Sequence, residues 1–197
     1  MKQYIKKIIP AATLLMAFGM TSCNSDLDVT PINPNLALEY DVNGLFTKCY
    51  ATLALQGNTG GNGDCDIDDI DGGTSAFIRQ LWNSNELTTD EAICWWGDAG
   101  ISEFCFNNYS PSHPMLNGFF ARLTTAVTYC NQYLSVESGH DATMTAEIRY
   151  LRAMEYYFLM DAFGSIPFST EPLASPSQLS RQEAFNWIEN ELLEIHS

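Results

Sequence analysis

The chain has 197 residues, 46% of them hydrophobic, and its 24 acidic residues against nine lysines and arginines give a formal charge of −15 at pH 7. This acidity excludes nucleic acid as a partner, because phosphate contacts need cationic side chains. It also disfavours acidic polysaccharides as ligands and leaves neutral glycans or cationic surfaces open. The length and apolar content predict a single globular domain.

The N-terminus has the features of an export signal. Three lysines precede an apolar run over residues 8–20, which is too short to span a membrane and is interrupted by Pro10. The run ends in Met-Thr-Ser-Cys, similar to a bacterial lipobox, which predicts removal of residues 1–22 and acylation of Cys23. The acyl chains would hold the protein on a membrane without spanning it. The alternative is an ordinary cleaved signal followed by an incidental cysteine.

A polar tether and a first helix are expected next. Residues 23–40 contain Pro31 and Pro34 and are predicted to be extended. Asp41 is the predicted N-cap of the helix that follows. Apolar residues recur at helical spacing on one face of this helix: Val42, Leu45, Phe46, Cys49, Tyr50 and Leu53.

Residues 56–74 form a long loop rich in Gly, Asn and Asp, and a loop of this length is usually functional or disordered. Five aspartates between residues 64 and 71 offer oxygen ligands at near-alternate positions, which suggests calcium. The bidentate glutamate and the glycine placement of an EF-hand loop are absent, so a solvated acidic loop is favoured and no metal site is predicted.

The remaining cysteines number five after Cys23, at wide spacings with no C-x-x-C motif. Neither a zinc site nor an obligatory set of disulfides follows from this pattern. Cys49 and Cys130 fall on apolar helix faces, where we expect them to act as small hydrophobic residues.

Two adjacent tryptophans are the first candidates for ligand binding. A short helical face is predicted from Phe77, Ile78, Leu81 and Trp82, with Arg79 on the same helix. After it come N-E-L-T-T-D-E over residues 85–91 and then Trp95 and Trp96. Adjacent indoles on an irregular segment cannot easily enter one core, so we expect one to be exposed, where its face would suit a sugar ring. The alternative places one indole in the core and the other over a helix edge.

Two long helices are predicted to pair as antiparallel neighbours, because the segment that joins them is short. The first spans residues 115–134. The second begins at a cap provided by Asp141 or Thr143 and ends at Gly164, and Pro167 prevents its resumption. The apolar positions of this second helix are Ile148, Leu151, Met154, Phe158 and Ala162, with a second row of Tyr150, Ala153 and Tyr157.

The charged residues of the second long helix give three further expectations. Arg152 and Glu155 are three residues apart and are expected to pair on the surface. The arginines of this helix are expected to anchor neighbouring loops. Asp161 opposes the helix dipole in the last turn and needs a cationic or hydrogen-bonding partner.

The last predicted helix begins at Ser180, which forms a capping box with Glu183. Its expected apolar face is Phe185, Ile188, Leu192 and Ile195. Strand signals are few, so the expected fold class is all-α.

Two of these segments resemble a known family. The sequence A-E-I-R-Y-L-R-A-M-E-Y-Y-F-L-M-D-A-F-G-S-I-P-F over residues 146–168 resembles the signature helix of the SusD/RagB family of surface glycan-binding lipoproteins, and residues 85–91 resemble its N-E-L-x-T-D-E run. The resemblance implies helical pairs in a tetratricopeptide-like arrangement with long irregular loops. It also implies that residues 41–197 form the N-terminal helical domain, incomplete relative to a full-length member.

The resemblance further implies a surface-exposed lipoprotein of the outer membrane, facing the cell exterior, that captures a neutral oligosaccharide or polysaccharide and caps a SusC-like TonB-dependent transporter. In starch-binding members, tryptophans just after the N-E-L-x-T-D-E run and an arginine before it contribute to the site. Residue by residue this points to Trp96 and Arg79, with Trp95 beside them. Cys94 occupies the place of the first tryptophan in a W-x-W arrangement and Ala99 that of a polar residue, so the identity of the glycan stays open.

Two other function classes were weighed. A glycoside hydrolase needs two suitably spaced carboxylates, for which Glu86, Asp90 and Glu91 are candidates. These residues also fit helix caps and turn contacts, so neither catalysis nor a cofactor is expected. The third class is a truncated structural remnant that folds without binding a ligand.

Overall fold

The computed structural model describes residues 41–55, 67, 74–136, 141–172 and 174–196, all of which belong to one compact unit, Tyr40–Ser197. The predicted signal, the tether, the acylation site Cys23 and the loop aspartates that suggested calcium lie outside the described residues. The predicted division into residues 1–22, 23–40 and 41–197 stays a prediction.

The described residues are mostly helical, which confirms the all-α expectation. Two three-residue strands form one antiparallel pair in which Ile166 faces Leu179; this pair was not predicted. The helices are α2 (Val42–Ala51), α3 (Phe77–Glu86), α4 (Ile101–Cys105), α5 (Pro114–Ser135), α6 (Ala142–Phe163) and α7 (Arg181–His196), and the strands are β1 (Ile166–Phe168) and β2 (Ser177–Leu179).

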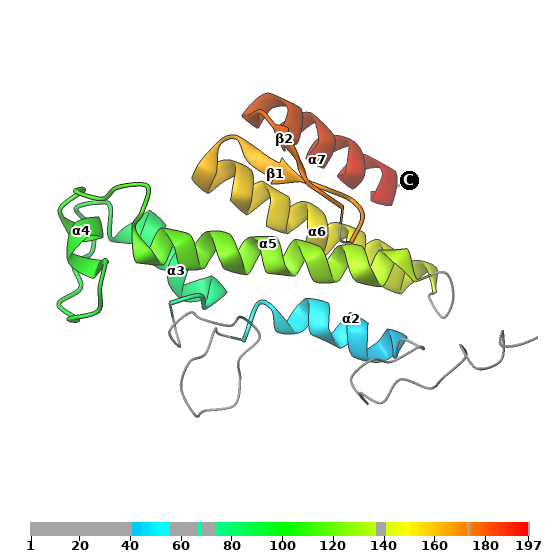
Figure 1. The fold of residues 1–197 in the computed structure, drawn as a ribbon, viewed down its shortest axis with the longest axis horizontal. Helices are drawn as coiled ribbons and strands as arrows, with labels where there is room; N and C mark the ends of the chain where they lie inside the picture. Colours follow the sequence, from blue (N-terminus) through cyan, green and yellow to red (C-terminus); the bar gives the residue numbers. More distant parts are fainter. Residues whose placement is uncertain (1–40, 56–66, 68–73, 137–140, 173, 197) are drawn as a thin grey trace, which may run out of the picture. The chain divides into compact units, whose positions relative to one another are not determined.

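The helices α5 and α6 form the centre of the unit and run antiparallel, as expected from their short connection (Figure 1). Helix α7 packs on α6, while α2 packs on both long helices and α3 packs on α5. The arrangement is a set of packed helical pairs, consistent with the tetratricopeptide-like scaffold.

The ends of α6 are formed as the sequence predicts. The Asp141 carboxylate accepts a hydrogen bond of 2.7 Å from the Met144 N–H, so Asp141 rather than Thr143 caps the helix. Gly164 ends it with a positive φ of 76°, and its N–H donates to the Met160 carbonyl. Asp161 has the partner that its position requires, because an Arg181 nitrogen lies 3.8 Å from its carboxylate and donates to its carbonyl.

The charges in the middle of α6 contradict the prediction of a surface pair. Arg152 and Glu155 are only 7% and 2% exposed. Arg152 donates to the Asn131 side chain of α5 at 3.0 Å and to Glu191 of α7 at 2.9 Å. Arg152 therefore connects α6 to two other helices, α5 and α7. It does not anchor a neighbouring loop, as the sequence had predicted.

The apolar stripe of α6 is rotated from its predicted position. Ile148 and Leu151 are buried as expected, but Met154 and Phe158 are only partly buried and Ala162 is exposed. The buried positions of the helix are Ile148, Leu151, Arg152, Ala153, Glu155, Tyr156, Leu159 and Met160. The inward charges shift the buried face, which leaves two residues of the predicted second row, Tyr150 and Tyr157, exposed.

On α7 and α3 as well, the buried residues differ from the predicted apolar face. On α7 the capping box is confirmed, since the Ser180 N–H donates to the Glu183 carboxylate at 2.8 Å. The expected apolar residues Phe185 and Leu192 are nevertheless exposed, and Ala184, Ile188 and Glu191 are buried. On α3 the buried residues are Phe77, Gln80 and Asn83, whereas Ile78 and Trp82 are exposed.

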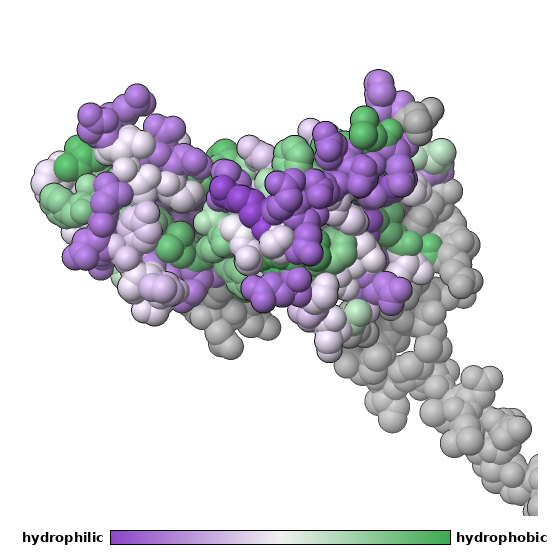
Figure 2. Space-filling model, turned by 90° about the horizontal axis from the view of Figure 1, so that it is seen from above, coloured by the Kyte–Doolittle hydropathy of each residue, from purple (hydrophilic) through white to green (hydrophobic). Residues whose placement is uncertain are grey.

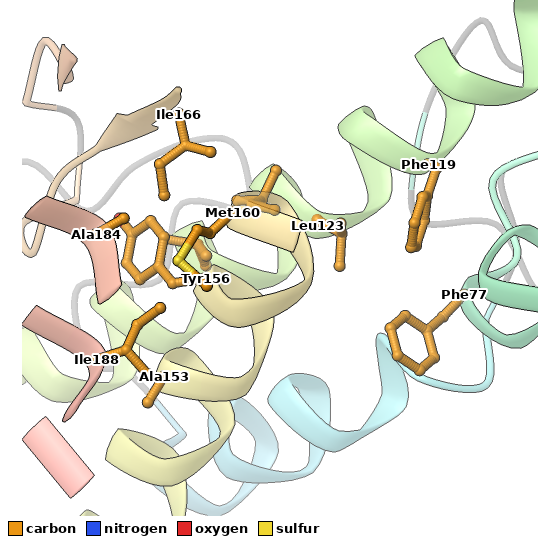
Figure 3. Close-up of a cluster of buried hydrophobic side chains, with 11 residues drawn as sticks. Phe77, Phe119, Leu123, Ala153, Tyr156, Met160, Ile166, Ala184 and Ile188 are labelled. Carbon is orange, nitrogen blue, oxygen red and sulfur yellow. The ribbon is translucent and has the colours of Figure 1, made fainter. Parts of the chain in front are cut away.

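The main core lies where α3, α5, α6, α7 and β1 meet (Figure 3). Phe119 and Leu123 of α5 lie beside Phe77, and Tyr156 of α6 lies among Ile166, Ala184 and Ile188. A second cluster joins α2 to α5 and α6 and contains Cys49 and Cys130, so these thiols are buried as small hydrophobic residues, as predicted.

The segment before α3 is attached tightly to α5, and this attachment fixes the position of Arg79. Arg122 donates from its Nε to the Ser75 carbonyl at 2.7 Å. Gly118 allows the chains to approach closely, because a Cβ there would lie 2.3 Å from the Thr74 carbonyl oxygen. The residues just before α3 are therefore held against α5 by a hydrogen bond and by close packing.

Candidate functional site

The segment between α3 and α4 is held by one buried residue of the N-E-L-T-T-D-E run. Leu87 is fully buried in a small cluster with Ile101, Phe104 and Met115. The Asn107 side chain, in a turn of positive φ, donates to the Thr88 carbonyl at 3.1 Å. These contacts fix the start of the segment that carries the tryptophans.

The polar side chains of the same run bond mostly to nearby backbone. Asn85 donates to the Leu81 carbonyl at 2.7 Å, and Thr88 donates to the Ser84 carbonyl at 2.9 Å. The Thr89 hydroxyl donates to the Glu86 carbonyl and accepts from the Glu91 N–H. This pattern ends α3 and turns the chain, which is the structural role considered for the run.

Both adjacent indoles are exposed, where the sequence predicted one. Trp95 is 81% exposed, the highest value among the large apolar side chains that the structure describes, and Trp96 is 67% exposed. From the same segment, Ala92 and Cys94, and not the indoles, pack against the Leu87 cluster. The alternative with one tryptophan in the core is therefore wrong.

The structure brings Arg79 and Trp96 together. The guanidinium carbon of Arg79 lies 5.6 Å from the centroid of the Trp96 ring, within the range of a cation–π contact. Arg79 also forms an ion pair with Asp98, a residue that the sequence analysis did not single out. The only available signal for Asp98 was its position two residues after Trp96. Trp95 shares the exposed segment with these residues.

The local surface has the chemistry of a shallow carbohydrate site. An exposed indole face suits the apolar face of a sugar ring. A guanidinium has five donors and a carboxylate several acceptor positions, so Arg79 and Asp98 can bond to each other and still orient hydroxyl groups. Figure 2 shows further hydrophobic residues at the surface around α4, interspersed with hydrophilic ones. Exposed apolar residues of this region include Ile93 and Phe106.

The strongest electrostatic effects lie away from the tryptophans, in the packing of α6 against α5 and α7. Burial raises the pKa of Glu155 to about 8. Hydrogen bonds from Arg149 and Arg152 hold the pKa of Glu191 below its ordinary value, although its partial burial opposes them. The same contact with Glu191 raises the pKa of Arg149. Glu191, Arg149 and Arg152 bond to one another within the fold, whereas the buried Glu155 Oε2 has no hydrogen-bond partner among the described residues.

Metal binding finds no support in the part of the chain that the structure describes, where no three His, Cys, Asp or Glu side chains gather to hold an ion. Across the same residues, no helix combines the length and apolar character needed to cross a membrane.

One curated relative is clearly similar in sequence. Over 99% of its own length the chain is 36% identical to starch-binding protein SusD of Bacteroides thetaiotaomicron. The chain spans 37% of the length of that relative. No family model matches the sequence.

Solved structures agree on the fold. A SusD-like carbohydrate-binding protein from Bacteroides fragilis matches 78% of the chain and 30% of its own length, with a TM-score of 0.53 and 16% identity. Surface glycan-binding protein A from Bacteroides fluxus matches 81% of the chain and 33% of its own length, with a TM-score of 0.54 and 23% identity. At these identities the likeness concerns the fold alone.

Proposed function

Because the chain belongs to the SusD family, we propose that it binds a neutral glycan through Trp96, Trp95 and Arg79. The observation that carries the proposal is the exposure of two adjacent indoles beside a bonded arginine and aspartate. Burying an aromatic side chain stabilises a fold substantially, so two indoles left in water contribute little to this one. We infer that these two indoles stack on the rings of a bound glycan.

The ligand class follows from charge and from the relatives. The chain carries a formal charge of −15, which disfavours anionic glycans, while the charges of Arg79 and Asp98 offset each other beside the indoles. The sequence relative is named a starch-binding protein and the structural neighbours are named for carbohydrate or glycan binding. An α-glucan is therefore the first ligand to test, within a panel of neutral oligosaccharides.

The proposed role is capture without chemistry. We propose that the mature protein is held on the outer membrane by lipid on Cys23, faces the cell exterior and caps a SusC-like TonB-dependent transporter for glycan uptake. Family membership and the lipobox-like N-terminus support this arrangement. The relatives are named as binding proteins, which agrees with a protein that is not an enzyme.

Anchoring is tested by labelling. Cells that express the wild type should incorporate labelled fatty acid into the protein, and the protein should partition into detergent. The substitution Cys23→Ala should abolish both. Release of an unlabelled wild-type protein in soluble form would contradict the anchor while leaving glycan binding untouched.

Glycan binding is tested by calorimetric titration with maltoheptaose, cellohexaose, xylohexaose and mannohexaose. We expect one of these to bind weakly, because the site is shallow and has little enclosure. Trp96→Ala should weaken binding about tenfold, since an aromatic contact contributes about 0.5–1.5 kcal/mol beyond its buried area. Trp95→Ala should weaken it by a smaller factor.

The matched control is Ile78→Ala, which removes another exposed apolar side chain, from the helix that carries Arg79. It should leave the affinity unchanged. Undiminished binding by both tryptophan variants would contradict the aromatic site. Failure of the wild type to bind any glycan of the panel would favour the structural remnant instead.

A further inference from the structure

A cavity lies beside α3, away from Trp95 and Trp96. It has a volume of 260 Å³ and opens where α3, the turn before α5 and the last turn of α6 meet. Aromatic and aliphatic core side chains line its floor, while Asn85, Thr88, Tyr109 and Asp161 contribute polar groups.

The helical geometry of α3 separates this cavity from the tryptophans. Successive residues of an α-helix are about 100° apart, so Leu81 lies about 200° around the axis from Arg79. Leu81, Ser84 and Asn85 line the cavity, whereas Arg79 contacts Trp96. The buried face of α3, which includes Gln80 and Asn83, lies between the two. The cavity is thus a separate place on the surface.

Tyr109 supplies a fixed aromatic surface. Its ring makes an edge-to-face contact with Phe104 at 5.6 Å and lies 6.2 Å from the His113 ring. His113 is itself held, because its Nε2 hydrogen-bonds the Gly100 carbonyl oxygen at 2.9 Å. Tyr109 is 47% exposed and, among the described residues, its hydroxyl has no hydrogen-bond partner. The ring is therefore oriented by the protein and its hydroxyl is free for a ligand.

Asn85 and Asp161 supply hydrogen-bonding groups on two sides of the opening. Asn85 uses one N–H for the Leu81 carbonyl, which leaves its amide oxygen and second N–H available. The Asp161 carboxylate is exposed, and its ion-pair partner Arg181 lies at the long distance of 3.8 Å. Both residues line the cavity and offer polar atoms to the hydroxyl groups of a ligand.

From this combination we propose that the cavity binds a single neutral pyranose ring, as a second sugar site of the protein. An aromatic ring together with amide and carboxylate groups in one cavity is the chemistry that recognises a sugar. The volume lies below the about 300–1,000 Å³ of drug-sized pockets, which limits the occupant to about one ring. The Asp161 carboxylate disfavours uronic acids, since Arg181 offsets its charge only across the long distance of 3.8 Å. The inference rests on the proposed glycan-binding function but uses none of its residues.

The experiment is a titration of ¹⁵N-labelled protein followed by two-dimensional NMR. The probes are methyl α-D-glucopyranoside, methyl β-D-galactopyranoside, glucuronate and tetramethylammonium, each raised to its solubility limit. They are added to the wild type and to the double variant Trp95→Ala/Trp96→Ala. We expect a neutral glycoside to shift the amide signals of Asn85, Tyr109 and Phe163 equally in both proteins, and glucuronate to shift none of them.

Variants of the cavity sharpen the result. Tyr109→Ala should weaken the glycoside response about tenfold, as expected for loss of an aromatic contact. Tyr109→Phe keeps the aromatic ring, so it should weaken the glycoside response less than Tyr109→Ala does. Asp161→Asn should admit glucuronate. Thermal melts of each variant check folding, and these side chains are exposed enough for substitution to be tolerated.

The outcomes separate the two sites. Glycoside shifts near Trp96 alone, or a response that disappears in the double tryptophan variant, would overturn the second site and leave the proposed function standing. Cavity shifts of equal size in the wild type and the double tryptophan variant would support the second site, whatever the calorimetric titration shows for the tryptophans. Shifts by tetramethylammonium but by no sugar would identify a cation site and overturn the inference. Absence of cavity shifts with every glycoside would overturn the second site, while the calorimetric titration with oligosaccharides decides the first.

Discussion

The contact of α6 with α7 and the segment between α3 and α4 place charged and aromatic side chains in opposite ways. In the first region Arg152 and Glu191 are buried and bond to each other at 2.9 Å. In the second, Trp95 and Trp96 project into solvent, where they bury little area. The contact of α6 with α7 therefore buries charged side chains, whereas the segment between α3 and α4 exposes aromatic ones.

The difference separates structural residues from candidate binding residues. Buried charges persist only when they are paired and hydrogen-bonded, and Glu191 has partners in both Arg149 and Arg152. These carboxylate and guanidinium groups bond to one another within the fold, although the buried Arg152 Nε has no hydrogen-bond partner among the described residues. The two indoles contribute little to the packing of the fold, so their exposure suggests a role in binding a ligand. Four predictions test this contrast.

The largest expected effect is in the core. Phe119 of α5 is buried between α3 and α6, and Phe119→Ala should lower the free energy of unfolding by about 3–5 kcal/mol, because it leaves a cavity in packed surroundings. Urea denaturation measures the loss. The adjacent control Phe120→Ala removes a partly exposed ring and should cost less than half as much. Equal losses would show that burial does not rank these positions.

The buried ion pairs come next. Glu191→Ala leaves Arg149 and Arg152 without their shared carboxylate and should cost about 3 kcal/mol in the same assay. The matched control is Glu194→Ala, an exposed glutamate that also bonds Arg149, and it should cost less than about 1 kcal/mol. If the two variants were equally stable, α7 would be held by its apolar contacts alone.

Glu155 adds a pH dependence to the same region. Burial raises its pKa from 4.5 to about 8, so it is protonated in the folded chain at pH 7 but ionised in the unfolded chain. The folded state then binds more protons, and stability should fall as pH rises from about 5 to 8, by up to about 1.4 kcal/mol per pH unit.

Glu155→Gln should remove this decline, because an amide does not ionise. Urea melts of both proteins at a series of pH values give the two slopes. The depressed pKa of Glu191 affects stability at lower pH. The stabilisation that its ionised carboxylate contributes is lost as the pH falls below the ordinary pKa of 4.5. An unchanged slope in the Gln variant would mean that Glu155 is ionised in the folded protein.

The smallest effect on stability is expected at the tryptophans. Trp96→Ala and Trp95→Ala should each change the free energy of unfolding by less than about 0.5 kcal/mol, as is usual for exposed side chains. The same melts measure it. A loss of about 2 kcal/mol or more would place the indole in the packing of the fold and remove its value as a binding candidate.

Local signals explain what the sequence predicted well. The bounds of α6 depend on Asp141 and Gly164, which act on backbone groups within four residues. The capping box of α7 is equally local. The pairing of α5 with α6 followed from a short connection. Such features need no knowledge of distant segments.

Contacts between distant residues explain what the sequence did not predict. Arg152 seemed a surface residue because its partners, Asn131 and Glu191, are 21 and 39 residues away. The pairing of Arg79 with Asp98 spans 19 residues and was missed for the same reason. The sequence did not show which side chains of the segment pack on the Leu87 cluster, and these are Ala92 and Cys94 rather than an indole. The glycan-binding roles of Arg79, Trp95 and Trp96 stay predictions.

The most direct test of the central claim is whether a glycan covers the exposed indoles. Iodide quenching of tryptophan fluorescence measures this in a Trp82→Phe background, which removes the partly exposed indole of α3 and leaves Trp95 and Trp96 as the most exposed indoles of the described residues. A glycan that binds in calorimetry should lower the quenching constant and shift the emission to shorter wavelength. Binding of that glycan with unchanged quenching would contradict the account, because the ligand would then lie elsewhere on the protein.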